Sequence, residues 1–500
     1  MFEKNEFELT ALLSISEEAY KPSLLVKWPG FCVLLDVAVD LRPLLHFLPV
    51  SLVHSDRLSR LRSVVSELTS ELKVCEEKAL VDGQPEFLAP QLTSIPVEQL
   101  DVVLVSNCAS LLGLPFLASR PGFRAVVYAT DPTLQFGRLV IDELLEYYER
   151  VVKQPSGTGW RNQQFFRNYE TVLPSDPLFW TPLYDVEAVN AAIARVQLIA
   201  HKETVDFYGV AQISAYSSGY SLGSCNWLIQ TDYGKLSYMS CSSVLSSHPK
   251  GLNVSPLRNA DQLIVTGLTQ TPSRTAETAI ADFCLNVVST LRSGGNVLVP
   301  CLPTGTLYDQ LECVVAHMDK AGISADVPIY FVSPVADSTL AYANIHAEWL
   351  SEAKQSKVYE PKEPFDHGEL VKSGRLKVYP NIYKEFSREI RTPCVVFTGH
   401  TSLRFGDAVH FLEMWGSDPN SAVIITDPEF SMEDLLAPFQ PLEMKHFFIP
   451  IDTRLDVAQV NKLLKELSPK LLLVPETSRD GQEGLSVHYV SFLFTGPLLL

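Results

Sequence analysis

Short apolar runs separated by polar turns fill the first half of the chain, a pattern typical of a β-rich domain. Apolar runs predict buried strands over 24–28, 31–36, 101–105, 125–129 and 205–213. The alternating run over 226–240 turns at Asp232-Tyr233-Gly234 and predicts a hairpin. Helical spacing of apolar residues predicts helices over 57–80 and 186–200, and another that begins at Asp131-Pro132 with Asp131 as its N-cap. Residues 153–185 have no clear period and predict a long surface loop.

From about residue 261 onward, apolar strands alternate with amphipathic helices, which indicates a mostly parallel sheet covered on both faces. Strands are predicted over 263–265, 296–300, 329–333, 394–397 and 422–426, and helices over 275–292, 306–320, 338–354 and 404–416. A last unit is predicted as a strand over 447–451, a helix over 455–467 and a strand over 471–474. The hydrophobic tail over 477–500 is expected to be either a packed terminal strand or an altered C-terminus.

The composition is that of a soluble globular protein with two to four domains: 500 residues, 46% hydrophobic and 20% charged. A net charge of −18 argues against a broad basic groove for nucleic acid, and therefore against an independent RNA-binding module. The nine cysteines form no C-x-x-C pair, which is typical of a reducing compartment. The N-terminus lacks the pattern of a signal peptide, and no apolar run is long enough to span a membrane. We expect a protein of the cytosol or nucleus.

Two short motifs invite a functional interpretation that their surroundings do not support. Gly219-Tyr220-Ser221-Leu222-Gly223 matches the G-x-S-x-G nucleophile elbow, but a predicted strand follows where that motif requires a helix. Residues 398–402 lie between a predicted strand and a helix, where either an ordinary turn or a backbone nest for an anion is possible. We predict neither a serine hydrolase nor a nucleotide site.

The eleven histidines include no H-x-H and no H-x-x-x-H pair, and His400 and His410 are ten residues apart. A two-zinc hydrolase needs imidazoles and carboxylates that converge on metals about 3.5–4 Å apart. The sequence therefore predicts no metal ligands, no catalytic residues and no cofactor-binding residues.

Five segments occur in an order that resembles the β-CASP branch of the metallo-β-lactamase superfamily: 217–224, 266–270, 294–301, 395–407 and 450–455. That family comprises RNA 3′-end endonucleases and their inactive partners, and the resemblance covers about 22–476. It implies an αββα sandwich with an inserted, doubly wound α/β domain. The implied domains are a metallo-β-lactamase-like first part at 1–265, a β-CASP domain at 266–445, a metallo-β-lactamase-like final part at 446–476 and an atypical tail at 477–500.

The same resemblance implies that most metal-binding positions of the family are changed in this chain. Active members carry H-x-H-x-D-H after a buried strand, where this chain has Ser106-Asn107-Cys108-Ala109-Ser110-Leu111-Leu112. Aligned with the family, the metal-binding and catalytic positions become Asp36 (kept), Asn107, Ala109, Leu111, Leu112, Tyr220, Cys241, and positions near Gly267, Asp452 and Pro475.

Loss of these ligands implies a catalytically silent protein that pairs with an active endonuclease of the same family in the nucleus. The alternative is an active zinc-dependent RNA endonuclease with a divergent ligand set. Residues 1–20 depart from the usual first strand of the family. The C-terminal region through which such partners pair is not recognisable in 477–500, which weakens the expectation of tight pairing and leaves contacts through the body of the protein.

Overall fold

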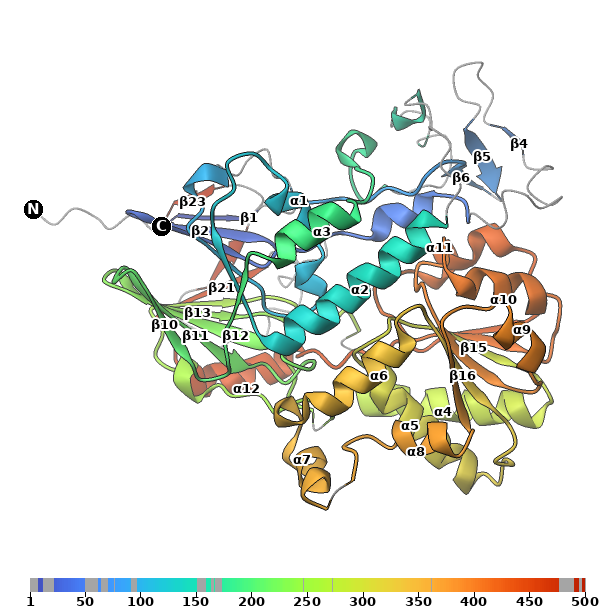
Figure 1. Ribbon diagram of the computed structural model, residues 1–500. Coiled ribbons are helices and arrows are strands. Elements are labelled where there is room, and N and C mark those ends of the chain that lie inside the picture. Colours follow the sequence, from blue (N-terminus) through green and yellow to red (C-terminus); the bar gives the residue numbers. More distant parts are fainter. Residues whose placement is uncertain are drawn as a thin grey trace, which may run out of the picture.

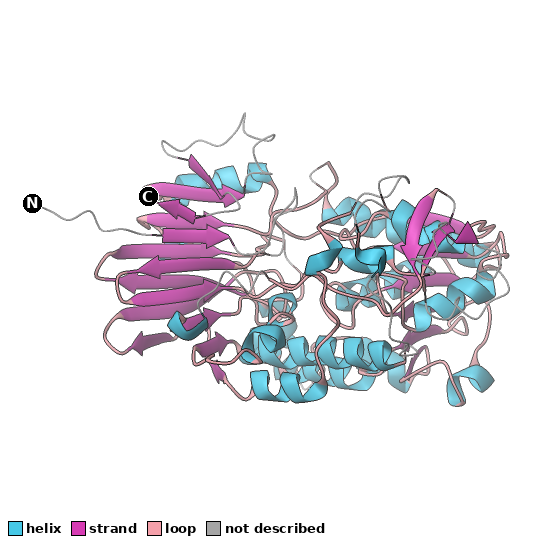
Figure 2. Ribbon diagram, turned by 90° about the horizontal axis from the view of Figure 1, so that it is seen from above, coloured by secondary structure: helices cyan, strands magenta, loops and turns pink. Residues whose placement is uncertain are grey.

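In a computed structural model, the described residues are 8–11, 22–49, 62–63, 71–75, 77–90, 97–150, 159–162, 166, 173–245, 247–271, 273–360, 362–475, 490–493 and 497–499. They form two packed β-sheets with helices outside them, and a third sheet with its own helices (Figure 1). The strands of the sandwich lie together at one end of the molecule, and the third sheet lies at the other end (Figure 2). This is the α/β architecture that the sequence predicted.

Each sheet of the sandwich has seven strands. The first sheet has the order β23 (Pro497–Leu499), β1 (Glu8–Ala11), β2 (Leu24–Trp28), β3 (Phe31–Leu35), β7 (Val102–Leu104), β8 (Val126–Ala129), β9 (Val196–Leu198). The second has the order β10 (Thr204–Phe207), β11 (Ala211–Ser217), β12 (Cys225–Thr231), β13 (Gly234–Met239), β14 (Gln262–Val265), β21 (Leu471–Pro475), β22 (Val490–Leu493).

Alternate residues of the two sheets form the core of the sandwich, as the period of two in a strand requires. Leu35 and Leu104 of the first sheet belong to one cluster with Trp227 and Tyr238 of the second. Side chains of both sheets therefore share one buried layer. The loops that follow β3, β7 and β13 meet at one edge of this layer.

Helices cover the outer faces of the sandwich. The first sheet is covered by α1 (Leu114–Ala118), α2 (Asp131–Glu149) and α3 (Val186–Ile193), and the second by α12 (Val457–Leu467). The N-cap of α2 is Thr130, whose side chain accepts a hydrogen bond from the Thr133 N–H, and Asp131 is the first helical residue. The prediction of Asp131 as N-cap was wrong by one residue, because a threonine can also accept this bond.

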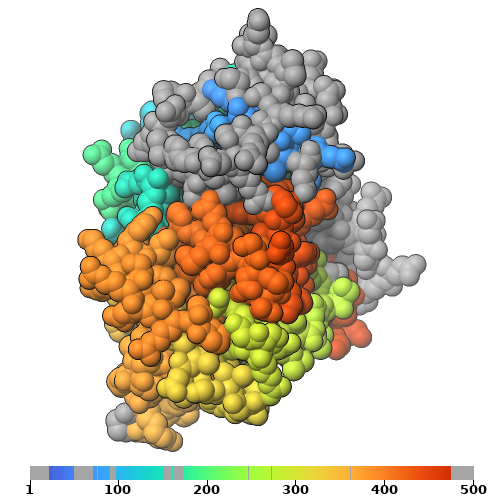
Figure 3. Space-filling model, turned by 90° about the vertical axis from the view of Figure 1, so that its right-hand side faces the viewer, coloured from blue at the N-terminus to red at the C-terminus, as the bar shows by residue number. Residues whose placement is uncertain are grey.

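The third sheet and its helices are here called the inserted domain. Its six parallel strands have the order β17 (Leu376–Tyr379), β16 (Ile329–Val332), β18 (Val395–Thr398), β15 (Val297–Pro300), β19 (Ala422–Ile425), β20 (Lys445–Phe448). One face packs on α4 (Ala276–Arg292), α5 (Leu307–Lys320), α6 (Ala336–Ile345) and α8 (His367–Lys372). The other packs on α9 (Glu385–Glu389), α10 (Asp407–Trp415) and α11 (Met432–Leu436). A further helix, α7 (Glu352–Tyr359), follows α6, and Figure 3 shows the outward surface of this domain.

Short 3-10 helices connect these elements: η1 (Arg42–His46), η5 (Val97–Gln99), η6 (Ala109–Leu111), η7 (Gly159–Arg161), η9 (Pro177–Phe179), η10 (Ser255–Leu257), η11 (Ala347–Trp349) and η12 (Ala437–Phe439). In the described part of the chain, no helix is both long and apolar enough to cross a membrane.

Four predicted elements differ from the structure. The helix predicted over 338–354 is interrupted, because α6 ends at Ile345 and η11 separates it from α7. The helix predicted over 57–80 is wrong at 62–63 and from residue 72 onward, since β4 (Arg62–Ser63), β5 (Leu72–Cys75) and β6 (Lys78–Val81) form a small sheet there. Residues 57–61 and 64–70 lie outside the described residues. Burial of Leu72 against Phe47 and Trp160 favours the strand over the helical spacing.

The other two differences lie at the edges of the sandwich. The helix predicted over 186–200 ends at Ile193, because 196–198 pair with the open edge of β8 as strand β9. The strand predicted over 205–213 is a hairpin of β10 and β11, turning at Tyr208-Gly209, where both residues have positive φ. The described parts of the tail form β22 and β23, which favours the packed-strand alternative.

Candidate functional site

The residues aligned with the family's metal ligands come together where β3, β7 and β13 end. Asp36 directly follows β3, and its side chain is fully buried. One carboxylate oxygen, Oδ1, accepts a hydrogen bond of 2.7 Å from the Ser106 N–H. The other, Oδ2, accepts bonds of 2.7 Å from the Tyr238 hydroxyl and 2.9 Å from the Ser240 hydroxyl. The protein itself therefore supplies three donors to the one carboxylate that the family pattern retains.

Burial raises the pKa of Asp36, and the hydrogen bonds from Tyr238 and Ser106 oppose that shift. Removal of charged groups from water is costly unless they are bonded, which explains why so many donors surround this carboxylate. Asp36 thus acts as the centre of a hydrogen-bond network that joins the two sheets.

The turn after β7 is packed rather than open. The Asn107 side chain accepts a bond of 3.1 Å from the Ser110 N–H and so holds the start of η6. Leu111 and Leu112 are buried, and Leu111 lies so close to Gly137 of α2 that a Cβ at Gly137 would be 2.5 Å from its Cδ2. Two positions that the resemblance aligns with family ligands therefore carry buried apolar side chains.

A second part of the candidate site contains Tyr220, Cys241 and Gly267. A Cβ at Gly267 would lie 2.6 Å from the Cys241 Sγ, so the position aligned with a family carboxylate has no room for any side chain. Burial raises the pKa of the Tyr220 phenol, and Cys241, Arg454 and Asp452 lie near enough to influence it. Tyr220 is therefore a neutral, half-buried group at neutral pH.

Asp452, aligned with a late histidine of the family, is bound by an arginine of the same loop. Arg454 donates from Nε to Oδ1 at 2.8 Å and from Nη2 to Oδ2 at 2.6 Å. The Thr269 hydroxyl adds a bond of 2.9 Å to Oδ2. Burial opposes ionisation of Asp452, but the Arg454 guanidinium outweighs it and lowers the pKa of this carboxyl. A guanidinium thus neutralises Asp452 in a place where the family pattern calls for a metal ligand.

The remaining candidates do not complete a metal site. Within the described residues, no group of three or more His, Cys, Asp and Glu side chains is placed to hold a metal ion. His400 is buried in the turn after β18, where its Nδ1 lies 2.9 Å from the Ser402 hydroxyl, and His410 lies on α10 beside Glu413. Pro475 ends β21 and offers no donor side chain. Zinc is usually held by three or four side chains, and the described arrangement does not provide them.

The G-x-S-x-G segment has the local structure of a turn between strands. Ser221 donates its N–H to the Ser224 Oγ at 2.9 Å, and Ser224 leads directly into β12. The Ser221 hydroxyl is buried and has no hydrogen-bond partner among the described residues. The helix that a nucleophile elbow requires is absent here, as the sequence predicted.

Side chains that sequence reasoning did not identify also shape the site. Tyr238 and Ser240 lie 202 and 204 residues from Asp36, and no local pattern links them to it. Arg454 gave a usable signal, because an arginine two residues after an aspartate can form a two-bond pair within one turn.

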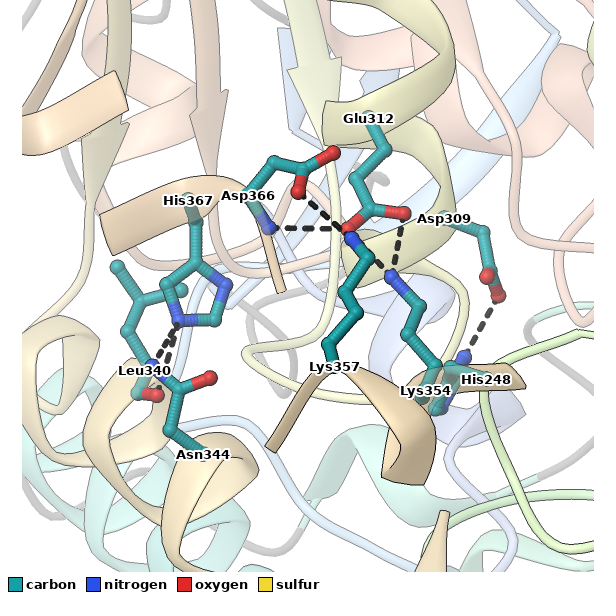
Figure 4. A network of polar contacts seen from close by, with 9 residues as sticks. All are labelled: His248, Asp309, Glu312, Leu340, Asn344, Lys354, Lys357, Asp366 and His367. Carbon is teal, nitrogen blue, oxygen red and sulfur yellow. Dashed lines mark hydrogen bonds and ion pairs between the residues drawn. The ribbon is translucent and has the colours of Figure 1, made fainter. Parts of the chain in front are cut away.

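A polar network fixes the sandwich against the inserted domain (Figure 4). His248, in the loop after β13, is buried, and its Nδ1 lies 2.7 Å from Asp309 of α5. Its carbonyl accepts a bond of 2.9 Å from the Ser351 N–H. Within the inserted domain, Lys354 of α7 pairs with Glu312 of α5 at 2.5 Å and so fixes α7, next to the residue that bonds His248. Direct contacts between charged and polar groups therefore hold the two parts in one orientation.

Known protein families match both parts of the chain. Residues 84–243 match the metallo-beta-lactamase superfamily domain, and 310–429 match the Beta-Casp domain. The chain is 46% identical to "Integrator complex subunit 9" of Xenopus laevis and 45% identical to the human protein of that name, in each case over 93% of this chain and 72% of the relative. It is 23% identical to "Endoribonuclease ysh1" of Schizosaccharomyces pombe over 70% of this chain and 41% of that protein.

Proposed function

Because this chain belongs to the Integrator complex subunit 9 family, we propose that it is a non-catalytic scaffold subunit of the Integrator complex. In this role it pairs with the endonuclease subunit, Integrator complex subunit 11, and with other Integrator subunits. The pair acts in small nuclear RNA 3′-end processing and in cleavage of nascent transcripts, and the protein is located in the nucleus. It carries no catalytic, cofactor-binding or metal-binding residues of its own, and binds neither nucleic acid alone nor a membrane.

The observation that carries this proposal is that hydrogen bonds within the protein engage the carboxylate of Asp36. Donors from Ser106, Tyr238 and Ser240 bond both of its oxygens, so the protein itself uses three of the roughly four acceptor sites of this carboxylate. The Asp452 carboxylate is likewise engaged by Arg454. Without a metal, nothing in the described site would lower the pKa of a water molecule for attack on a phosphodiester.

A scaffold must present fixed surfaces, and the contacts between the two domains support that role. Besides the network around His248, the buried Arg404 of the inserted domain donates to the Leu45 carbonyl of the sandwich at 3.1 Å. We take the sandwich to comprise 1–265 and 446–476, the inserted domain 266–445 and the tail 477–500. Strand β20 crosses the boundary at 445 and completes the third sheet, and β22 and β23 of the tail add to the sheets of the sandwich.

The experiment compares metal content, RNA cleavage and pairing in one preparation of the full chain. We expect no stoichiometric zinc by mass spectrometry, no cleavage of a small nuclear RNA precursor, and co-purification with Integrator complex subunit 11. Two zinc ions per chain, together with cleavage that Asp36→Ala abolishes, would instead establish the alternative of an active endonuclease with a divergent ligand set. Failure to co-purify would overturn the pairing alone.

A further inference from the structure

A cavity of about 150 Å³ lies between the sandwich and the inserted domain, next to the site described above. Tyr220 and Arg454 of the sandwich line one side of it. The other side is made by residues that follow β15 and β19, among them Thr306 and Thr426. In open parallel sheets, ligands bind at this carboxyl edge of the strands. The cavity therefore has the position of a binding site even though the metal ligands are lost.

Two glutamine side chains in the wall of this cavity have unused hydrogen-bonding atoms. Gln310 of α5 is 1% exposed, and its Nε2 donates to the Thr306 hydroxyl at 3.1 Å and the Thr426 hydroxyl at 3.3 Å. Its Oε1 is buried with no partner among the described residues. The Oε1 and Nε2 of Gln270 are also buried, and neither has a partner there. Buried amides are rarely left without partners, so these three atoms require a bound molecule or water.

The charges around the cavity restrict the kind of molecule that fits. Arg454 is paired with Asp452, so its positive charge is already neutralised. Asp427 and Glu429 also line the cavity and would repel an anion. Pro300, Leu302, Leu307 and Ile451 complete the wall with apolar surface. These features favour an uncharged molecule with an apolar body and a polar edge.

We propose that this cavity binds a neutral single-ring compound that carries an amide, either as a substituent or within the ring. An amide offers one donor and one acceptor side by side, which matches the Oε1 and Nε2 of Gln270. A second donor on the same compound would bond the Gln310 Oε1. A cavity of this volume is large enough for one six-membered ring, since an apolar protein cavity of about 150 Å³ is known to bind benzene.

Nicotinamide and uracil are suitable probes, and titration calorimetry on the full chain measures their binding. Nicotinate has the same ring as nicotinamide but a negative charge, and we expect it to bind at least about tenfold more weakly than nicotinamide. Gln270→Leu keeps the size of the side chain and removes its amide, so both probes should bind roughly tenfold more weakly. Gln212→Leu, an exposed substitution on β11, is the matched control and should bind like the native protein.

The proposal is overturned if neither probe binds, if nicotinate binds as well as nicotinamide, or if Gln270→Leu binds both probes unchanged. In those cases water alone bonds the two glutamines. If Gln270→Leu fails to fold, Leu302→Trp takes its place, because an indole at this position of the wall fills the cavity and must abolish binding.

The same amide chemistry occurs in free metabolites and in the bases of RNA, and a comparison of uracil with a short oligouridylate distinguishes these sources. Tighter binding of the oligomer by about tenfold or more assigns the cavity to a base of an RNA strand, and would overturn the part of the proposed function in which the chain alone binds no nucleic acid. Equal binding assigns it to a free ring compound. Both results support the site, which extends beyond the scaffold role.

Discussion

Glu143 of α2 accepts a hydrogen bond of 2.5 Å from the hydroxyl of Ser333, which directly follows β16 of the inserted domain. The glutamate is fully buried, and the Tyr147 hydroxyl lies 3.4 Å from the same oxygen. Burial raises the pKa of Glu143 to about 8, although the hydrogen bonds from Ser333 and Tyr147 oppose the shift. At neutral pH a protonated carboxyl thus lies between the sandwich and the inserted domain.

Stability should consequently fall as the pH rises through the neutral range. In the unfolded chain Glu143 loses its proton near pH 4.5, so between about pH 4.5 and pH 8 the folded state binds one more proton than the unfolded state. The stabilisation is complete below the unfolded pKa and is lost as the pH approaches the folded value. We expect Glu143 to contribute a loss of about 2–3 kcal/mol between pH 6 and pH 8.5, measured by urea unfolding.

Glu143→Gln tests this assignment, because glutamine resembles the protonated glutamate and does not ionise. The variant should show a flatter pH dependence than the native protein and be the more stable of the two at pH 8.5. Glu149→Gln, an exposed change on the same helix, should retain the native pH dependence. Equal pH dependence in the native protein and Glu143→Gln would contradict the assignment.

Asp36 should contribute stability rather than activity. In Asp36→Asn, one oxygen that accepts bonds becomes an amino group facing the donors of Ser106 or of Tyr238 and Ser240. Such a mismatch costs about 1–3 kcal/mol in the free energy of unfolding, measured with urea. Asp232→Asn, in an exposed hairpin turn, should change stability little. If Asp36→Asn and the native protein had the same free energy of unfolding, the network would not contribute to stability.

Most of the fold could be predicted because its elements have strong periods. The buried strands of the parallel sheet, such as 297–300 and 422–425, are continuous apolar runs that the sequence shows directly. The segment over 72–81 could not be predicted in this way, because its strands depend on packing against Phe47 and Trp160. Those contacts join distant parts of the chain, so the spacing of apolar residues within the segment cannot reveal them.

In the candidate site, the sequence shows which residue types stand at the positions aligned with the family ligands, but not which contacts those residues make. Leucines at 111 and 112 and a tyrosine at 220 cannot act as family ligands, and this is readable from the residue types. The bonds from Tyr238 and Ser240 to Asp36 arise only when the two sheets stack. The orphaned amides of Gln270 and Gln310 likewise become visible only once the two domains enclose them.

Arg404 should be irreplaceable by lysine. Its side chain is fully buried, and its two terminal nitrogens donate to carbonyls that include Leu45, Asp434 and Leu435. Lysine keeps the charge but has a single nitrogen, so it cannot reach these carbonyls together. We expect Arg404→Lys to lose about 2–4 kcal/mol of stability in urea unfolding. Arg388→Lys on the exposed side of α9 is the control, and similar stability of the two variants would contradict the prediction.

Chelation should leave the thermal stability of the protein unchanged. A metal that binds only the folded state raises the melting temperature, and its removal lowers it. Since the Asp36 and Asp452 carboxylates are already bonded within the protein, we expect EDTA to shift Tm by less than about 1 °C. A clear fall in Tm with EDTA, reversed by added zinc, would point to a metal-binding arrangement that differs from the described one.

Gly267 should tolerate no side chain, so restoring a family carboxylate there cannot restore a metal site. Its φ is +63°, and a Cβ would lie 2.6 Å from the Cys241 Sγ and 2.9 Å from the Cys241 backbone nitrogen. Gly322 has a similar φ of +69°, but a Cβ there would meet nothing within 4 Å. Gly322→Ala should therefore report the conformational cost alone, about 1 kcal/mol, whereas Gly267→Ala adds a clash with backbone and should cost about 2–4 kcal/mol in urea unfolding. Equal losses in the two variants would mean that the loop after β14 moves aside readily, and that space for a ligand at this position could be regained.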